Sequence, residues 1–255
     1  MTYDIDKMAD DVWENGFAIF HGLMTPDDVD GIFSQMNQVF DVALEHCGAP
    51  EMKTKHIDEK YTFLEKNHPA LKSHCYDVLS QLDSVRTFVS KPEIFALAHK
   101  LYDSPIAVDL IQVRVNAPDN RYVQPWHQEL GQMSELNMTV WTPLVDIDEE
   151  IGGLFVVPQS HKRGLVKHYY MDHSGMKTKV HAIREEEMEG DEPFRVIMKA
   201  GDALAFHPHL FHVTADNNSD RTRWTIVTRY NELSKMHYLH SGDADKHVDE
   251  TLGTR

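Results

Sequence analysis

The chain has 255 residues, with 41 Asp and Glu against 25 Lys and Arg, which gives a formal net charge of −16 at pH 7. This excess of negative charge repels phosphate backbones and anionic lipids, so it argues against binding to nucleic acid or to a membrane. No apolar run approaches the ~18 residues that span a bilayer, and the first residues lack the basic and apolar regions of a signal peptide. We therefore expect a soluble cytoplasmic protein, in which Cys47 and Cys75 are reduced thiols.

The first part of the chain, residues 1–104, carries mainly helical patterns. Apolar residues on one helical face predict a helix over 4–14, and a short apolar run predicts a strand over 17–20. Thr25, followed by Pro26 and two aspartates, predicts a helix start with a capping side chain and acidic residues at the positive end of the helix dipole. Two more helices are expected at about 67–82 and 92–102.

From residue 105 the pattern changes to short alternating runs separated by Pro, Gly and Asn. Such spacing is typical of an all-β barrel or sandwich, so residues 105–231 are expected to form a β core on which the helices pack. Residues 164–195 are a polar insertion, for which a solvated loop and a lid over the mouth of a barrel are equally supported. With a C-terminal tail at 232–255, the chain 1–255 is expected to be a single domain.

Histidine is unusually frequent in this chain, with 17 residues, and it is the commonest metal ligand. His127 stands two residues before Glu129, so on a strand the imidazole and the carboxylate would lie on the same face. His212, on a later β segment, is the candidate for a third ligand. Two histidines and one carboxylate that leave other positions open are the ligand set that selects non-haem Fe(II) in oxygen-activating enzymes.

Other interpretations of these histidines remain open at this point. Most His-x-Glu pairs on strands are surface residues. His207, His209 and His212 could bind zinc without His127, or they could be strand histidines whose hydrogen bonds are satisfied.

Arg223 favours the iron interpretation. It lies downstream of His212 in a run where Arg223, Thr225 and Val227 share one strand face, and Thr214 shares a strand face with His212. An inward guanidinium is costly unless an anion meets it, and its planar donors suit a carboxylate. The missing partner is then the carboxylate of a ligand.

The β portion also carries several spaced motifs: Trp-His-x-acid, Val-Trp-x-x-Leu, a Gly-Asp turn followed by two spaced histidines, and Ser-Asp-Arg-x-Arg. The matching stretches are Trp126 to Glu129, Val140 to Leu144, Asp148 to His161, Gly201 to His212 and Asn218 to Arg223. In this combination the sequence resembles the phytanoyl-CoA dioxygenase family of Fe(II)/2-oxoglutarate oxygenases, from about residue 106 to 231.

The resemblance implies a mainly β fold with α-helices, whose core is a double-stranded β-helix, the jelly roll of cupin-like proteins, flanked by N-terminal helices. It implies that His127, Glu129 and His212 bind Fe(II). Most family members have Asp in the position of Glu129, so the longer side chain requires a strand slightly farther from the metal or a different mode of carboxylate binding. Because a carboxylate is retained, hydroxylation is favoured over halogenation, since the halogenating relatives have a small residue there.

The resemblance also implies a site for the cosubstrate. Arg223, with help from Thr214, takes the position that grips the distal carboxylate of 2-oxoglutarate, and Arg221 is interpreted as a surface cation. Asn116 is expected near the cosubstrate. Trp141 either lines this pocket or is a core residue.

The strand before the metal ligands has a polar face made of Gln112, Arg114 and Asn116. It is either an edge strand with this face in water or, in the family interpretation, a strand whose polar face points into the barrel. In the second case Gln112 and Arg114 lie near the substrate.

The remaining histidines are expected outside the ligand set. His161 shapes a loop, and His207 and His209 pack or orient the ligands. In the insertion, exposure to solvent and contact with substrate are both open for His168, His173 and His181.

Taken together, these features predict an Fe(II)- and 2-oxoglutarate-dependent dioxygenase that uses O2 to hydroxylate an unactivated C–H bond of a small metabolite, with release of succinate and CO2. The alternatives are a zinc- or other metal-binding cupin-like protein or hydrolase without 2-oxoglutarate, and a catalytically silent jelly roll that binds a small molecule. The sequence predicts neither the identity of the substrate nor the oligomeric state.

Overall fold

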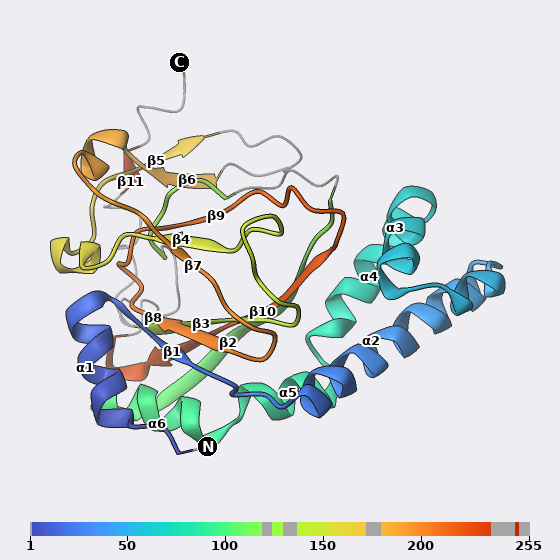
Figure 1. Ribbon diagram of the computed structural model, residues 1–255, viewed down its shortest axis with the longest axis horizontal. Helices are drawn as coiled ribbons and strands as arrows, with labels where there is room; N and C mark the ends of the chain where they lie inside the picture. The colour runs from blue at the N-terminus through green and yellow to red at the C-terminus, as the bar shows by residue number, and fades with distance from the viewer. Residues whose placement is uncertain (1, 119–123, 130–136, 172–179, 236–247, 250–255) are drawn as a thin grey trace.

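The computed structural model describes residues 2–118, 124–129, 137–171, 180–235 and 248–249. In this part of the chain, helices fill most of the region before residue 102 and strands most of the region after it (Figure 1). The change from helices to strands lies where the sequence predicts it. One strand, β1 (Phe17–Phe20), lies among the helices in sequence, again as predicted.

Six α-helices are present among the described residues: α1 (Ile5–Asn15), α2 (Pro26–His46), α3 (Ile57–Asn67), α4 (Pro69–Leu79), α5 (Asp83–Val89) and α6 (Pro92–Leu101). The four helices expected from the sequence are confirmed as α1, α2, α4 and α6, whereas α3 and α5 were not predicted. The start of α2 follows the predicted chemistry, because the Thr25 side chain accepts a hydrogen bond from the backbone N–H of Asp28 and the Asp28 carboxylate accepts one from the N–H of Thr25.

The β core contains two antiparallel sheets. The larger has the order β1, β8 (Ala203–Phe206), β3 (Asn137–Pro143), β10 (Arg223–Glu232) and β2 (Ile106–Asn116). The smaller has the order β7 (Phe194–Val196), β4 (Leu154–Val156) and β9 (His212–Thr214). Apolar side chains from both sheets share one buried cluster, which includes Trp141, Leu204, Val227, Leu154, Val156 and Val196.

Side chains alternate along β10 between the space inside these sheets and the helices outside, as the sequence predicts. Trp224 points outward, where it packs against Phe40 and Tyr61, and its indole N–H donates a hydrogen bond to Asp58. The helices therefore cover the outer face of the larger sheet, and the residues of β10 next to Trp224 face the interior (Figure 1).

A β-bulge interrupts β2 opposite the second half of β10. Val227 is paired with Gln112, but Arg229 is paired with Asp109, so one extra residue of β2 lies between these pairs. Leu110 has a φ of 39°, which is uncommon for a residue other than glycine. The bulge keeps Asp109 and Gln112 on the same face of the sheet although they are three residues apart.

The predicted insertion, residues 164–195, contains two strands, β5 (His168–Met171) and β6 (Val180–Ile183). They form a third sheet with β11 (Val248–Asp249), and Figure 1 shows it above the smaller sheet of the core. Ile183 N–H donates a hydrogen bond to the Trp126 carbonyl, so β6 is tied to the segment that carries His127. His173 lies outside the described residues.

None of the helices that the structure describes has the length and apolar character needed to cross a membrane.

Candidate metal and cosubstrate site

A backbone bridge brings two of the predicted metal ligands together. The N–H of His127 donates to the carbonyl of His212 over 3.0 Å, and the N–H of His212 donates to the carbonyl of His127 over 3.1 Å. Their imidazole rings consequently lie with centroids 4.0 Å apart. The segment around His127 is an isolated bridge rather than the regular strand that the sequence suggested, yet it still presents His127 and Glu129 to the same space.

Hydrogen bonds set the orientation of both imidazoles. The Nδ1 of His127 lies 2.7 Å from the Pro125 carbonyl, and the Nδ1 of His212 lies 2.9 Å from the Leu210 carbonyl. A carbonyl only accepts hydrogen bonds, so each Nδ1 carries the proton and each Nε2 keeps its lone pair for a metal ion. The Nε2 of His212 lies 3.5 Å from Oε1 of Glu129.

The three side chains fit a metal ion. One ligand atom from each of His127, Glu129 and His212 lies within 4.8 Å of the others. Burial, and then the neighbouring His212, hold the pKa of His127 well below its usual value. Burial raises the pKa of Glu129, but the neighbouring His212 and the charge of Arg229 lower it by more, so the pKa lies well below the ordinary value. A neutral imidazole and an ionised carboxylate are the protonation states that bind a metal.

Gln128 lies between two of these ligands in the sequence. It is fully buried, and both polar atoms of its side chain are hydrogen-bonded. Its side-chain amide donates to the Gly164 carbonyl over 2.8 Å and to the His209 carbonyl over 2.7 Å, and its side-chain oxygen accepts from the N–H of Val166 over 2.9 Å. The chain on both sides of Gln128 therefore has a fixed path, and so do His127 and Glu129.

The third sheet holds the backbone of the same residue. The N–H of Gln128 donates to Nε2 of His168, and Nε2 of His181 lies 3.2 Å from the carbonyl of Gln128. These two histidines come from β5 and β6, for which the sequence left exposure and substrate contact open. Both are instead at least partly buried, and His181 lines the cavity described next.

A cavity of about 500 Å³ opens on the metal-ligand candidates. All nine residues that the sequence analysis assigned to the site line it: His127, Glu129, His212, Arg223, Thr214, Asn116, Trp141, Gln112 and Arg114. A volume of this size suits a small ligand.

The strand register explains why the polar face of β2 reaches this cavity. Directly paired residues of neighbouring strands point to the same face of a sheet. The relevant pairs of β10 and β2 are Arg223 with Asn116, Thr225 with Arg114, and Val227 with Gln112. Among the described residues β2 is an edge strand of the larger sheet, but its polar face lines the cavity.

Arg223 is buried in this cavity and forms no ion pair with any described residue. Its guanidinium donates to the backbone carbonyls of Ile151 and Ala215, over 3.1 and 3.0 Å. Burial lowers the pKa of Arg223 to about 10, which still leaves the side chain charged at neutral pH. A buried cation whose hydrogen bonds go to backbone carbonyls is chemically suited to an anionic ligand.

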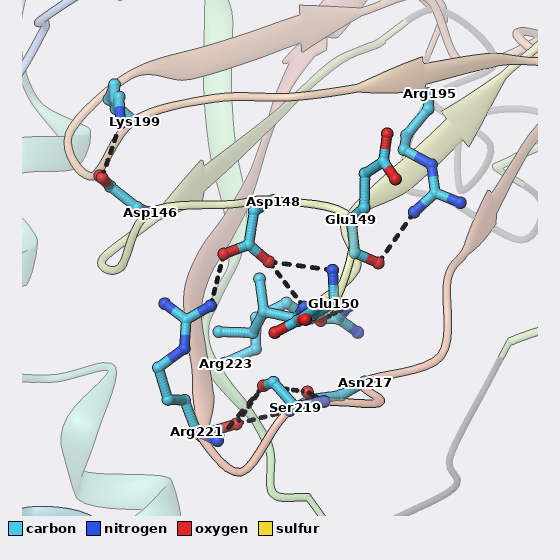
Figure 2. A network of polar contacts seen from close by, with 11 residues as sticks. Asp146, Asp148, Glu149, Glu150, Arg195, Lys199, Asn217, Ser219, Arg221 and Arg223 are labelled. Atoms are coloured by element: carbon cyan, nitrogen blue, oxygen red, sulfur yellow. Dashed lines mark hydrogen bonds and ion pairs between the residues drawn. The ribbon is translucent and has the colours of Figure 1, made fainter.

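Arg221 has the opposite environment. It is exposed and pairs with Asp148 at the turn before β10, while Arg223 points away from that pair (Figure 2). The structure thus confirms Arg221 as a surface cation.

The histidines of the zinc alternative do not gather around one point. His207 is packed against Trp13 and His161, and its Nδ1 accepts a hydrogen bond from the N–H of His209. His161 in turn bonds the Trp13 carbonyl through Nε2. Within the described part of the chain, the group of metal-binding side chains that does converge is His127, Glu129 and His212.

Arg229 also lines the cavity, although no sequence motif pointed to it. Its guanidinium donates to Oε2 of Glu129 over 2.6 Å. Arg229 and Arg223 are an even number of residues apart on β10, so strand alternation could have placed both on the same face. No comparable signal points to Tyr76, which lines the cavity from α4.

Comparison with known proteins identifies the family. Residues 12–225 match the family described as "Phytanoyl-CoA dioxygenase (PhyH)". The chain belongs to the phytanoyl-CoA dioxygenase family. Membership makes it an Fe(II)- and 2-oxoglutarate-dependent dioxygenase, with iron, 2-oxoglutarate and O2 as its cofactors and cosubstrates.

Three relatives illustrate the range of this similarity. The chain is 23% identical over 245 residues to the peroxisomal phytanoyl-CoA dioxygenase of Rattus norvegicus, which covers 92% of this chain and 70% of that one. It is 25% identical over 170 residues to the L-proline trans-4-hydroxylase of Streptomyces griseoviridis, with 57% and 62% covered. The epimerase SnoN in complex with Fe3+, alpha ketoglutarate and nogalamycin RO has a TM-score of 0.63 at 18% identity, with 89% and 83% covered. The last comparison confirms the predicted jelly-roll fold.

Proposed function

We propose that His127, Glu129 and His212 bind Fe(II), and that the enzyme hydroxylates an unactivated C–H bond of a small metabolite with release of succinate and CO2. The donor set supports this assignment, because two imidazoles and one carboxylate leave coordination positions open for other ligands. When bound, Fe(II) and 2-oxoglutarate together supply the activation of O2 that such an oxidation needs.

We further propose that Arg223 binds the distal carboxylate of 2-oxoglutarate, with Thr214, Asn116 and Trp141 around the cosubstrate. The observation that carries the proposal is that Arg223 is buried in the same cavity as the metal ligands, donates to two backbone carbonyls and forms no ion pair with a described carboxylate. A planar guanidinium and a carboxylate form paired charge-assisted hydrogen bonds.

The side chains around these groups would orient the ligands and exclude water. Leu154, Phe206 and Val227 give the cavity an apolar wall beside the metal ligands. Gln112 and Arg114 face the same cavity from β2 and are our candidates for contact with the substrate. An apolar wall with a few polar groups is typical of sites for small molecules.

The compartment and the partners also belong to the proposal. A cytoplasmic location, the absence of nucleic-acid and membrane partners, and the single-domain organisation with an insertion at 164–195 stay predictions from the sequence. A small-molecule substrate agrees with the family and with a cavity of about 500 Å³.

Replacement of Arg223 tests the cosubstrate assignment. Arg223→Ala should weaken the binding of 2-oxoglutarate by roughly 30-fold or more, because the carboxylate loses a buried charged partner. The measurement is the concentration of 2-oxoglutarate that gives half-maximal succinate formation with Fe(II) and O2 present. Arg221→Ala is the matched control, since Arg221 is exposed and pairs with Asp148, and it should behave as the unmodified protein. Equal effects of the two replacements would exclude Arg223 as the cosubstrate receptor.

A further inference from the structure

The charge of the cavity is opposite to the charge of the chain. Among the described residues that line it, the charged side chains are Arg114, Arg223, Arg229 and Glu129. Three of these four are cations, although acidic residues exceed basic ones in the chain as a whole and the net charge is −16. A cavity of this kind concentrates anions.

The proposed function accounts for only part of this positive charge. The charges of Fe(II) and of Arg223 are balanced by Glu129 and by the two carboxylates of 2-oxoglutarate. Arg114 and Arg229 then have no counter-charge among the described lining residues, since Asp109, which is paired with Arg229 across the strands, does not line the cavity and accepts a hydrogen bond from Asn231. Arg229 forms an ion pair with Glu129. The same carboxylate is a proposed metal ligand, so its single negative charge is already counted against the metal ion.

The hydrogen bonds of Arg229 are also incomplete. One terminal nitrogen donates to Oε2 of Glu129, while the Nε is buried and has no partner among the described residues. A buried donor without a partner is costly, and a ligand that accepts its hydrogen bond removes that cost. Arg229 is paired across the sheet with Thr139, which lines the same cavity.

Arg114 is a further cation on the cavity face of β2, opposite Thr225, which lies between Arg223 and Arg229 on β10. Its Nε donates to the side-chain oxygen of Gln112 over 3.2 Å, and it forms no ion pair with a described residue. Arg114 and Arg229 both belong to the β2–β10 pair, on the face that lines the cavity. Arg223, in contrast, is tied to Ile151 and Ala215.

We propose that Arg229 forms a subsite for a carboxylate of the substrate, distinct from the 2-oxoglutarate subsite at Arg223, with Arg114 on the neighbouring strand between the two. The substrate is therefore a small carboxylic acid that is held by this charge beside the metal ligands. This inference rests on the proposed function, because it assigns the substrate class of the same site.

Matched probes test the subsite without knowledge of the natural substrate. The full chain is loaded with Mn(II), which replaces Fe(II), and saturated with 2-oxoglutarate so that Arg223 is occupied. Cyclohexanecarboxylate, cyclohexanecarboxamide and cyclohexylmethylammonium have similar shapes and differ in charge. The paramagnetic relaxation of their protons by Mn(II) reports both affinity and closeness to the metal. The carboxylate should bind at least about tenfold more tightly than the amide, and the ammonium more weakly than both.

Variants identify the residue that causes the preference for the carboxylate over the amide. Arg229→Gln should bring the carboxylate and the amide to within about twofold of each other, and Arg229→Lys should restore part of the difference because it keeps the charge. Arg114→Gln should reduce the preference, and the surface variant Arg221→Gln should leave it unchanged. Equal binding of carboxylate and amide by the unmodified protein would overturn the proposal, and so would an undiminished preference in Arg229→Gln.

The same samples separate this inference from the proposed function. If the metal-loaded protein fails to bind 2-oxoglutarate, the function is wrong, and the probes are then compared in Arg223→Gln. A carboxylate preference that persists there and disappears in Arg229→Gln supports the subsite independently. A preference that disappears with Arg223 instead contradicts it.

Discussion

His207 is a buried histidine outside the metal site. Its ring lies between Trp13, His161 and His209, at centroid distances of 5.8, 5.1 and 5.1 Å. Burial, with smaller contributions from His209 and His161, lowers the pKa of His207 to about 3. The folded protein therefore keeps this imidazole neutral in mild acid, where the unfolded chain protonates it.

This difference predicts a loss of stability in acid. Because the folded pKa is below the unfolded value of about 6.5, the contribution of His207 is present above that value and is lost as the pH falls from about 6.5 towards 3. Between about pH 7 and pH 5 it amounts to up to about 2 kcal/mol. His207→Gln should make the free energy of unfolding less pH-dependent by this amount, as measured by urea denaturation at both pH values. Each protein is compared with itself at the two pH values, so a loss of packing energy that is independent of pH cancels. An unchanged dependence would mean that His207 is protonated in the folded state.

The residues of the site differ in how far the sequence could predict them. Arg223 was found because its type, its strand parity and its place after His212 all agree with an inward anion receptor. Arg229 has the same parity, but parity alone does not reveal that its guanidinium reaches Glu129, a residue far away in the sequence. The tautomers of His127 and His212 were also beyond prediction, since they depend on the carbonyls of Pro125 and Leu210.

At the scale of elements, the third sheet supports the metal site through Gln128. Its strands β5 and β6 supply His168 and His181, which meet the backbone of Gln128, and the loop before β5 supplies the partners Gly164 and Val166. Gly164, Val166, His168 and His181 therefore support the candidate metal ligands without being ligands themselves. Partners of this kind determine how well a site holds its metal.

Gln128→Leu should consequently weaken Fe(II) binding. The replacement keeps a side chain of similar size but leaves the groups at Gly164, Val166 and His209 without their side-chain partner. The segment from His127 to Glu129 then loses its fixed path. We expect the dissociation constant for Fe(II), measured anaerobically by competition with a chelator, to rise about 10–100-fold. Gln38→Leu, at an exposed position on α2, is the matched control and should bind iron normally. Unchanged iron affinity in Gln128→Leu would show that the ligands do not depend on this residue.

Elements with a strong local signal were predictable. The cap at Thr25 and the alternation along β10 are examples, because each depends on residues close together in the chain. The bulge at Leu110 was not predictable, since a positive φ at a leucine is favoured only by its surroundings. The short helix α5 lacks a side-chain cap, and its buried residues Val85 and Phe88 give too few turns for a clear period.

At the scale of the whole molecule, the helices pack on the outer face of the larger sheet (Figure 1), and residues of the two core sheets line the cavity. On the outer face Trp224 and Tyr230 belong to the apolar cluster of the helices, while the opposite face of the same strand carries Arg223 and Arg229. A strand that is buried on both faces holds its cationic side chains in fixed positions. The net charge of −16 thus says little about the cavity, whose sign is set by a few inward residues.

The central claim is that one cavity binds Fe(II) through His127, Glu129 and His212 and binds 2-oxoglutarate beside it. The most direct measurement is the visible absorption that 2-oxoglutarate produces when it binds to Fe(II), recorded anaerobically on the full chain. This absorption should appear and saturate at one equivalent of each ligand, and it should be lost in His212→Ala. Absence of the absorption in the unmodified protein with both ligands in excess, or the same absorption in His212→Ala, would contradict the central claim.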